Sequence, residues 1–348
     1  MNAVRLFEYG GPEVMQYLEV DTPQPGPGEV VVRIHGATIS GFDLLFRKGS
    51  LKQFPGRPPF ALPFQLGREG AGEVAALGAN VDDWSVGDRV VLMPSPACGH
   101  CVSCLRGDDA LCLNTAMPGQ TRFGTQAEYV VVRATDILAA PDGVSFEILA
   151  GAIHNFVTVW HGAFTRGQLG PGQDVMITGA GGGLGSAAIV LAKFAGARRI
   201  IAVTGAPQKS QRLRDLGATD VLNWREQDVP AEVRKLTRGA GVDLVLDHVG
   251  GALFTLGIHA VRLGGTVVAS AEVGGTTVEL NLAQAVGKHL NILGTRSSNR
   301  AEQETVLSLV GAGKLKPVIS EVMPFSEAPD AHRRLESDEL VGKIVLVP

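Results

Sequence analysis

Short runs of hydrophobic residues separated by turns characterise the first 150 residues of the chain. Residues 30–32 and 88–92 are two such runs, and the proline- and glycine-containing segments 25–28 and 67–72 are typical of turns. This pattern predicts a β-rich domain over residues 1–150, with a turn at each of the two segments.

After about residue 170 the pattern changes, because strand-like and helix-like segments begin to alternate. The expected order is strand 174–178, a glycine turn, helix 186–195, strand 199–204 and helix 207–216, followed by strands at 221–223, 244–247, 266–270 and 291–294. Alternation of this kind is typical of a parallel sheet with right-handed crossovers. Residues 151–295 are therefore predicted to form a doubly wound α/β domain that binds a nucleotide.

The C-terminal segment 296–348 returns to mixed character and ends in an apolar strand at 343–347. A length of 348 residues fits about two domains at roughly 150 residues each. We therefore predict that the α/β domain interrupts the β-rich domain, to which the C-terminal segment returns.

Composition supports a folded chain, because 45% of the residues are hydrophobic and only 19% are charged. The chain has 45 glycines in 348 residues, about twice the average share of about 7%. This excess indicates tight turns or backbone that approaches a ligand closely. The net charge of −4, without a basic block, argues against a nucleic-acid partner. Residues 1–10 lack the apolar core of a signal peptide and no apolar run approaches 18 residues, so we expect a soluble cytoplasmic protein without membrane contact.

The glycine turn after the first predicted α/β strand is the strongest nucleotide-binding signal. It comprises Ala180, Gly181, Gly182, Gly183, Leu184 and Gly185. A strand before the glycines and a helix after them is the context that a dinucleotide-binding turn requires, because the backbone approaches the pyrophosphate and the first helical N–H groups attract its charge. The alternative is a merely structural turn.

The end of the second strand indicates which coenzyme is bound. An acidic residue there would bind a ribose 2′-hydroxyl and repel a 2′-phosphate, but this strand ends at Thr204 and Gly205 without one. Lys209, Arg212 and Arg225 follow nearby. We therefore predict NADP(H), the alternative being that these cations form an ordinary solvated helix face.

All four cysteines fall in one 15-residue window with the spacing C-x2-C-x2-C-x7-C: Cys98, Cys101, Cys104 and Cys112. Four thiolates on a short loop are typical of a closed tetrahedral zinc site, which leaves no position for water. The prediction is one structural zinc in a lobe at about 95–115, the alternative being four reduced thiols.

Taken together, these motifs resemble the medium-chain dehydrogenase/reductase superfamily, which includes zinc alcohol dehydrogenases and quinone (enone) oxidoreductases. Besides the cysteine lobe and the glycine turn, the likeness rests on 67–72 (GREGAG), 86–90 (VGDRV), 124–129 (GTQAEY), 243–251 (DLVLDHVGG) and 342–346 (GKIVL). The resemblance implies a GroES-like catalytic domain, a Rossmann domain, an active site between them and a homodimer formed through the edge of the Rossmann sheet. It also implies cofactor contacts from Thr158, Val249, Gly250 and Lys343.

The positions that match the catalytic zinc ligands of the alcohol dehydrogenases carry other residues: Ser40 and His154 replace cysteines, and Arg68 replaces a histidine. A guanidinium stays protonated and has no lone pair for a metal, so we predict that the catalytic zinc is absent. The hydroxyl and the histidine of the alcohol proton relay are likewise replaced, by Phe42 and Leu45.

The predicted function is NADPH-dependent reduction of an activated C=C bond or a quinone, with Ser40, Arg68 and His154 as the candidate catalytic residues. Two alternatives stay open: a metal-independent carbonyl reductase or alcohol dehydrogenase, and an NADPH-binding protein with little turnover. Structural roles are also open, since His154 could be a satisfied residue at a helix start and Arg68 could pair with Asp43 or Glu69.

Overall fold

The computed structural model describes residues 1–50 and 61–348, which form two compact units. The first unit comprises Met1–His154, Ser298–Asp338 and Lys343–Pro348, and the second comprises Asn155–Ser297 and Glu339–Gly342. Each unit has its own sheets, and each is described by itself.

A seven-stranded sheet forms the centre of the first unit, with strand order β14-β15-β3-β4-β5-β7 and β6 paired with β3. Its strands are β3 (Glu29–Ile39), β4 (Gly70–Leu77), β5 (Arg89–Leu92), β6 (Tyr129–Arg133), β7 (Ile137–Ala139), β14 (Ile319–Pro324) and β15 (Lys343–Val347). All neighbours are antiparallel except β14 and β15. A separate hairpin pairs β1 (Asn2–Leu6) with β2 (Met15–Glu19).

The helices of the first unit differ in length, and α9 is the longest that lies wholly within it. They are α1 (Gly41–Arg47), α2 (Val102–Leu105), α9 (Arg300–Gly311), α10 (Ala328–Glu336) and the first part of α3 (Phe146–Trp160), which a π-helical segment continues over His161–Arg166. Short 3-10 turns lie at Pro12–Val14, Asp109–Leu111, Ala134–Asp136 and Phe325–Glu327.

The predicted turn at 67–72 is wrong for its second half, because β4 begins at Gly70. Gly67 has a positive φ of 101°, as a turn glycine should, but Gly72 pairs with Ile34 of β3. A Cβ at Gly72 would lie 1.8 Å from the carbonyl oxygen of Arg33. These glycines therefore reflect the close approach of a neighbouring strand as much as a change of chain direction.

The second unit is built on a six-stranded parallel sheet with the order β10-β9-β8-β11-β12-β13. Its strands are β8 (Asp174–Ile177), β9 (Arg199–Thr204), β10 (Asp220–Asn223), β11 (Val242–Asp247), β12 (Val261–Ala269) and β13 (Asn291–Gly294). Numbered along the chain, this order is 3-2-1-4-5-6, the doubly wound arrangement whose switch point lies between β8 and β11. The predicted α/β fold class is confirmed.

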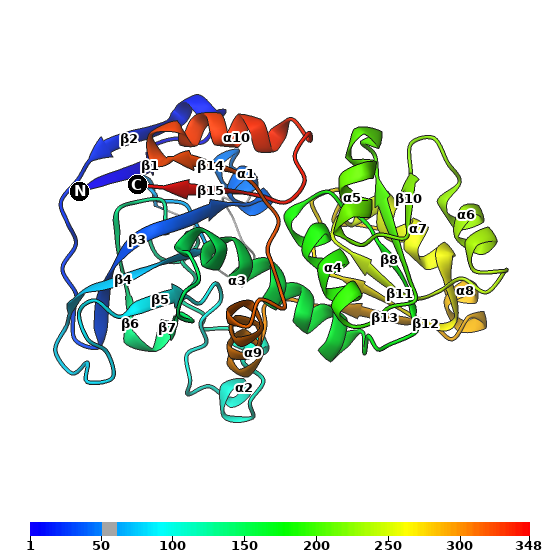
Figure 1. The fold of residues 1–348 in the computed structure, drawn as a ribbon, viewed down its shortest axis with the longest axis horizontal. Helices are drawn as coiled ribbons and strands as arrows, with labels where there is room; N and C mark the ends of the chain where they lie inside the picture. Colours follow the sequence, from blue (N-terminus) through cyan, green and yellow to red (C-terminus); the bar gives the residue numbers. More distant parts are fainter. Residues whose placement is uncertain (51–60) are drawn as a thin grey trace. The chain divides into compact units, whose positions relative to one another are not determined.

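Helices cover both faces of the parallel sheet (Figure 1). They are α4 (Gly183–Phe194), α5 (Ser210–Leu216), α6 (Val229–Leu236), α7 (Gly251–Ala260) and α8 (Leu282–Gly287). Because both faces are covered, β8 is buried at every position, which explains the apolar residues that follow Asp174. One cluster of the core joins β9, β11 and β12 to α6 and α7.

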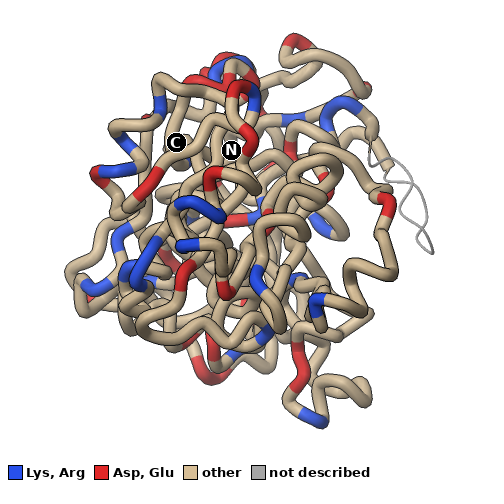
Figure 2. The backbone as a smooth tube through the Cα atoms, turned by 90° about the vertical axis from the view of Figure 1, so that its right-hand side faces the viewer, with Lys and Arg blue, Asp and Glu red and all other residues tan. Residues whose placement is uncertain are grey.

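The predicted strands at 199–204, 291–294 and 343–347 coincide with β9, β13 and β15. The helix predicted at 207–216 is divided into a 3-10 turn, Pro207–Lys209, and α5, while α4 begins three residues before the predicted start at 186. None of the described helices is long and apolar enough to cross a membrane. Acidic and basic residues are interspersed over the face shown in Figure 2.

Candidate active site and metal centre

Ser40 and Asp43 fix the start of helix α1 in the first unit. The backbone N–H and the hydroxyl of Ser40 donate to Asp43 Oδ2 at 2.8 and 2.7 Å, and the backbone N–H of Gly67 donates to Asp43 Oδ1 at 3.1 Å. Burial raises the pKa of Asp43, whereas these hydrogen bonds and the charge of Arg68 lower it. The hydroxyl proton of Ser40 is thus committed to a carboxylate, and Asp43, as the N3 residue of a capping box, also accepts from the backbone N–H of the N-cap residue Ser40.

Arg68 lies against an aromatic ring and a hydroxyl. Its guanidinium carbon is 4.9 Å from the centre of the Phe42 ring, and Nη2 donates to Ser95 Oγ at 3.3 Å. The planar cation is therefore held by a cation–π contact and a hydrogen bond. The sequence singled out Phe42 only as a missing relay residue and did not single out Ser95, because a partner 27 positions away leaves no periodic signal.

Glu69 is the centre of a second group of buried charges. Lys343 Nζ forms an ion pair with Glu69 Oε1, and His154 Nδ1 lies 3.8 Å from the same oxygen. Lys343 and Glu69 are 4% and 1% exposed, so their charges balance each other out of contact with water. Glu69 Oε2 and His154 Nδ1 have no hydrogen-bond partner among the described residues.

The alternative that His154 is a residue at a helix start is wrong, because His154 lies in the interior of α3. Burial, together with the charges of Arg68 and Lys343, lowers the pKa of His154 well below 6.5. The imidazole is therefore neutral at physiological pH, and it acts as a hydrogen-bonding group more readily than as an acid.

The three residues at the catalytic-ligand positions do not fit zinc. They present a hydroxyl that donates to Asp43, a guanidinium and one imidazole. Over residues 1–50 and 61–348, the one group of three or more His, Cys, Asp or Glu side chains that could hold a metal ion is the cysteine cluster.

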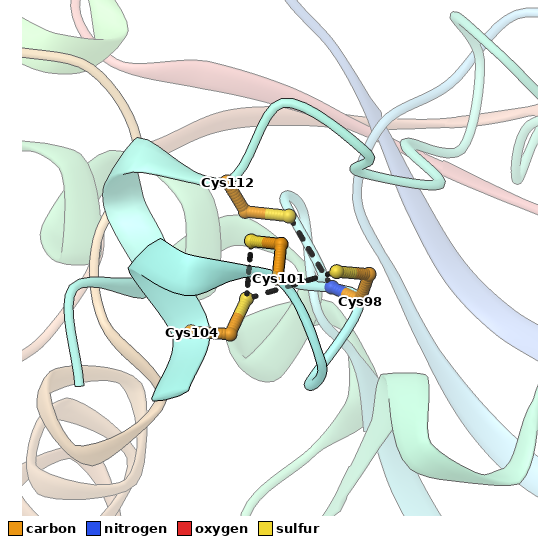
Figure 3. Close-up of side chains that lie close together, drawn as sticks. All are labelled: Cys98, Cys101, Cys104 and Cys112. Atoms are coloured by element: carbon orange, nitrogen blue, oxygen red, sulfur yellow. Dashed lines mark hydrogen bonds between the residues drawn. The ribbon is translucent and has the colours of Figure 1, made fainter. Parts of the chain in front are cut away.

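The four cysteine sulfurs converge in the lobe that contains α2 (Figure 3). All lie within 4.8 Å of one another, and the pairs Cys98–Cys104 and Cys101–Cys104 are 3.9 and 3.4 Å apart. Four sulfurs around zinc at about 2.3 Å would be roughly 3.8 Å apart, so the cluster fits a tetrahedral ion. Hydrogen bonds, that of the His100 backbone N–H first, lower the pKa of the Cys98 thiol to about 6, whereas burial and the neighbouring thiols raise the pKa of Cys104 to about 12.

Hydrogen bonds join the cysteine lobe to the start of helix α9. The backbone N–H of Ala110 donates to Asn299 Oδ1 at 3.0 Å, and the backbone N–H of Arg300 donates to Asp109 Oδ2 at 3.2 Å. A metal in the lobe would therefore stabilise the α9 terminus as well as the loop itself.

In the second unit, the glycine turn connects β8 to α4 at the switch point of the sheet. Gly182 is the residue before α4, and a Cβ at Gly185 would lie 2.2 Å from the carbonyl oxygen of Gly179. A Cβ at Gly181 would lie 2.7 Å from Cδ and 3.2 Å from Nζ of Lys209. The turn thus combines bare backbone, a helix N-terminus and a lysine, which suits a phosphate group.

A second basic side chain lies at the end of β9. A Cβ at Gly205 would be 2.6 Å from Arg225 Nε and 2.7 Å from Trp224 Nε1, so both side chains cross the backbone where β9 ends. The Arg225 guanidinium also lies 5.2 Å from the Trp224 ring centre. Lys209 therefore lies against the glycine turn at Gly181, and Arg225 lies at Gly205, where the sequence places the ribose.

The remaining residues predicted to contact the cofactor occupy separate positions. Gly250 has a φ of 80° and donates its N–H to Asp247 Oδ2 at 2.8 Å, just before α7. Val249 packs against the turn at Gly179. Thr158 is a buried residue of α3, and the ammonium of Lys343 is paired with Glu69 in the first unit. These assignments to the cofactor stay predictions.

A doubly wound sheet with a glycine turn at its switch point, in one chain with a mixed β sheet, is the architecture of a two-unit nucleotide-binding protein. Residues 26–142 match the family described as alcohol dehydrogenase GroES-like domain, and residues 183–312 match that described as zinc-binding dehydrogenase. A crystal structure of an NAD-dependent alcohol dehydrogenase superposes with a TM-score of 0.91 at 38% identity, each chain being covered completely.

Relatives among characterised proteins span almost the whole chain. An NAD-dependent alcohol dehydrogenase of Sulfolobus acidocaldarius is 32% identical over 99% of both chains. An acryloyl-coenzyme A reductase of Sulfurisphaera tokodaii is 28% identical over 95% of both chains. The chain belongs to the medium-chain dehydrogenase/reductase superfamily and is an oxidoreductase with a GroES-like and a Rossmann domain.

The sulfur geometry leads to a prediction about metal content. The purified protein should contain about one zinc ion per chain by plasma mass spectrometry, and Cys101→Ser should lose most of it and lower the thermal unfolding temperature, since a structural metal contributes to folding. His100→Ser, which alters the same lobe without removing a thiolate, is the control. Two zinc ions per chain in the wild type would contradict the assignment.

Proposed function

We propose that the protein is an NADPH-dependent reductase of activated C=C bonds or quinones that works without a catalytic zinc. The observation that supports this most directly is the Arg68 guanidinium, held over Phe42 at the position of a metal ligand. A fixed cation there stabilises negative charge developing on a carbonyl oxygen.

The side chains of the first unit divide between binding and positioning. Arg68 supplies the hydrogen-bond donor for the developing enolate oxygen. Ser40 donates its hydroxyl proton to Asp43, which also accepts from Gly67, and so positions the start of α1. Neutral His154, with an unpartnered Nδ1, offers a hydrogen bond to the reactant. When bound, the nicotinamide supplies the hydride, and conjugate reduction needs no removal of an alcohol proton.

A metal-independent carbonyl reductase or alcohol dehydrogenase is the second candidate. Alcohol dehydrogenases among the relatives favour it, whereas the acryloyl-coenzyme A reductase favours reduction of a C=C bond conjugated to a carbonyl. Oxidation of simple alcohols with NADP⁺ that chelators do not inhibit would support this second candidate over the first.

The experiment is a panel of enones, enoyl thioesters, quinones and aldehydes, with NADPH oxidation as the readout. At least one conjugated acceptor should be reduced, and Arg68→Met should lower kcat at least 100-fold, the usual effect of removing one oxyanion donor. Arg5→Met is the matched control, because Arg5 also lies over a phenylalanine ring, Phe123, in the same unit. Full activity of the Arg68 variant, or no turnover of any conjugated acceptor, would count against the proposal.

The coenzyme is proposed to be NADP(H) because Arg225 lies against Gly205 at the end of β9, Lys209 lies against the glycine turn, and β9 ends without the acidic residue that would select NAD. Several relatives are named NAD-dependent, which makes the preference a sharp test. Arg225→Ala should raise the Kd of NADPH at least tenfold and leave that of NADH nearly unchanged, because only the former carries the 2′-phosphate. Lys235→Ala, on an exposed helix face, is the control. Tighter binding of NADH than NADPH by the wild type would contradict the assignment.

A homodimer is proposed from the edge of the parallel sheet. The edge strand β13 is largely exposed, and Leu282 and Val286, one turn apart on α8, are 69% and 73% exposed. Apolar groups beside an open strand edge favour pairing with a second copy. Light scattering should give a dimer mass that Val286→Lys halves, whereas Val86→Lys, on an exposed residue of the first unit, should not. A monomeric wild type would overturn the proposal.

A further inference from the structure

His248 lies at the carboxyl end of β11, immediately beyond the switch point of the parallel sheet. Its ring Nδ1 is 2.6 Å from Ser270 Oγ, which follows β12. Its backbone N–H donates to Thr178 Oγ1, which follows β8, at 3.2 Å. The residue is therefore held by groups at the ends of the two strands that flank β11.

The hydrogen bonds around Ser270 determine which nitrogen of His248 carries the proton. Ser270 Oγ is 3.1 Å from the carbonyl oxygen of Asp247, which can only accept. Both contacts are hydrogen bonds only if Ser270 gives its single proton to that carbonyl and accepts the proton of Nδ1. Burial lowers the pKa of His248 to about 4, so the ring is neutral at pH 7 and Nε2 carries a lone pair.

This lone pair has no donor in the described part of the protein. His248 is 8% exposed, and its Nε2 is a buried atom with no hydrogen-bond partner. Leaving a buried acceptor unpaired is costly, and native structures rarely do so without a reason. The complementary group is a hydroxyl or amine donor that arrives with a bound molecule.

The topology indicates which molecule supplies that donor. In a doubly wound fold, the half formed by β8, β9 and β10 binds one nucleotide and the half formed by β11, β12 and β13 binds the other. The glycine turn, Lys209 and Arg225 belong to the first half and suit the phosphates and the adenosine ribose. His248 follows the first strand of the second half.

We propose that Nε2 of His248 accepts a hydrogen bond from a ribose hydroxyl on the nicotinamide side of the bound dinucleotide, with Ser270 as the positioning residue that fixes the ring. This inference rests on the proposed function, since it requires a dinucleotide. It adds a side-chain contact on the half of the sheet opposite to the adenosine site.

The test is isothermal titration calorimetry of NADPH and of 2′,5′-ADP, which represents the adenosine half. His248→Asn keeps an amide that can donate to Ser270 but has no atom at Nε2, so it should raise the Kd of NADPH about fivefold to tenfold, the usual effect of one hydrogen bond. The Kd of 2′,5′-ADP should not change. Matching thermal unfolding temperatures would show that the variant is folded.

Ser270→Ala separates positioning from structure. Alone it should raise the Kd of NADPH less than His248→Asn does, and added to His248→Asn it should have little further effect, because both act through the same nitrogen. Additive losses, an unchanged Kd for NADPH in His248→Asn, or an equal loss for 2′,5′-ADP would each overturn this inference while leaving the proposed function intact. A wild-type protein that binds neither NADPH nor NADH would instead overturn the proposed function.

Discussion

The buried carboxylate of Asp43 is the interaction on which the candidate site of the first unit depends. It accepts hydrogen bonds from two segments 24 positions apart, the start of α1 and the turn at Gly67. Burial raises the pKa of this group, and the three donors together with the charge of Arg68 oppose that rise. Removal of the carboxylate would leave buried donors on both segments without an acceptor, and it would release Arg68, which follows Gly67 directly.

Charge balance explains how the remaining side chains fit around this carboxylate. Asp43 and Glu69 supply two negative charges, and Arg68 and Lys343 supply two positive ones. A further positive charge on His154 would be unbalanced and poorly hydrated, which accounts for its lowered pKa. A divalent cation would face the same excess of positive charge, because Arg68 and Lys343 already supply the positive charge that an ion would otherwise supply.

The sequence is informative where one local pattern decides the structure. The central strands β8 and β9 are mostly apolar because they are buried on both faces, and the cysteine spacing places four sulfurs on one loop. Helix α3 is absent from the predicted elements, and nearly every residue from Leu149 onward is buried, so an apolar run there does not by itself distinguish a helix from a buried strand. The Glu69–Lys343 pair joins residues 274 positions apart, beyond the reach of any local pattern.

A buried polar atom without a hydrogen-bond partner indicates a binding site only where two further facts are known. These are the place of the residue in the fold and whether the atom is a donor or an acceptor. Both ring nitrogens of His332 lack a hydrogen-bond partner among the described residues, yet this histidine lies on α10 beside Arg47 in the first unit, outside the doubly wound sheet. His248 differs in two respects: a serine that must accept its Nδ1 proton fixes the free nitrogen as an acceptor, and the topology places that nitrogen at the end of a strand where a dinucleotide binds. An orphaned atom indicates that something is missing, and only its surroundings indicate what the missing group must donate.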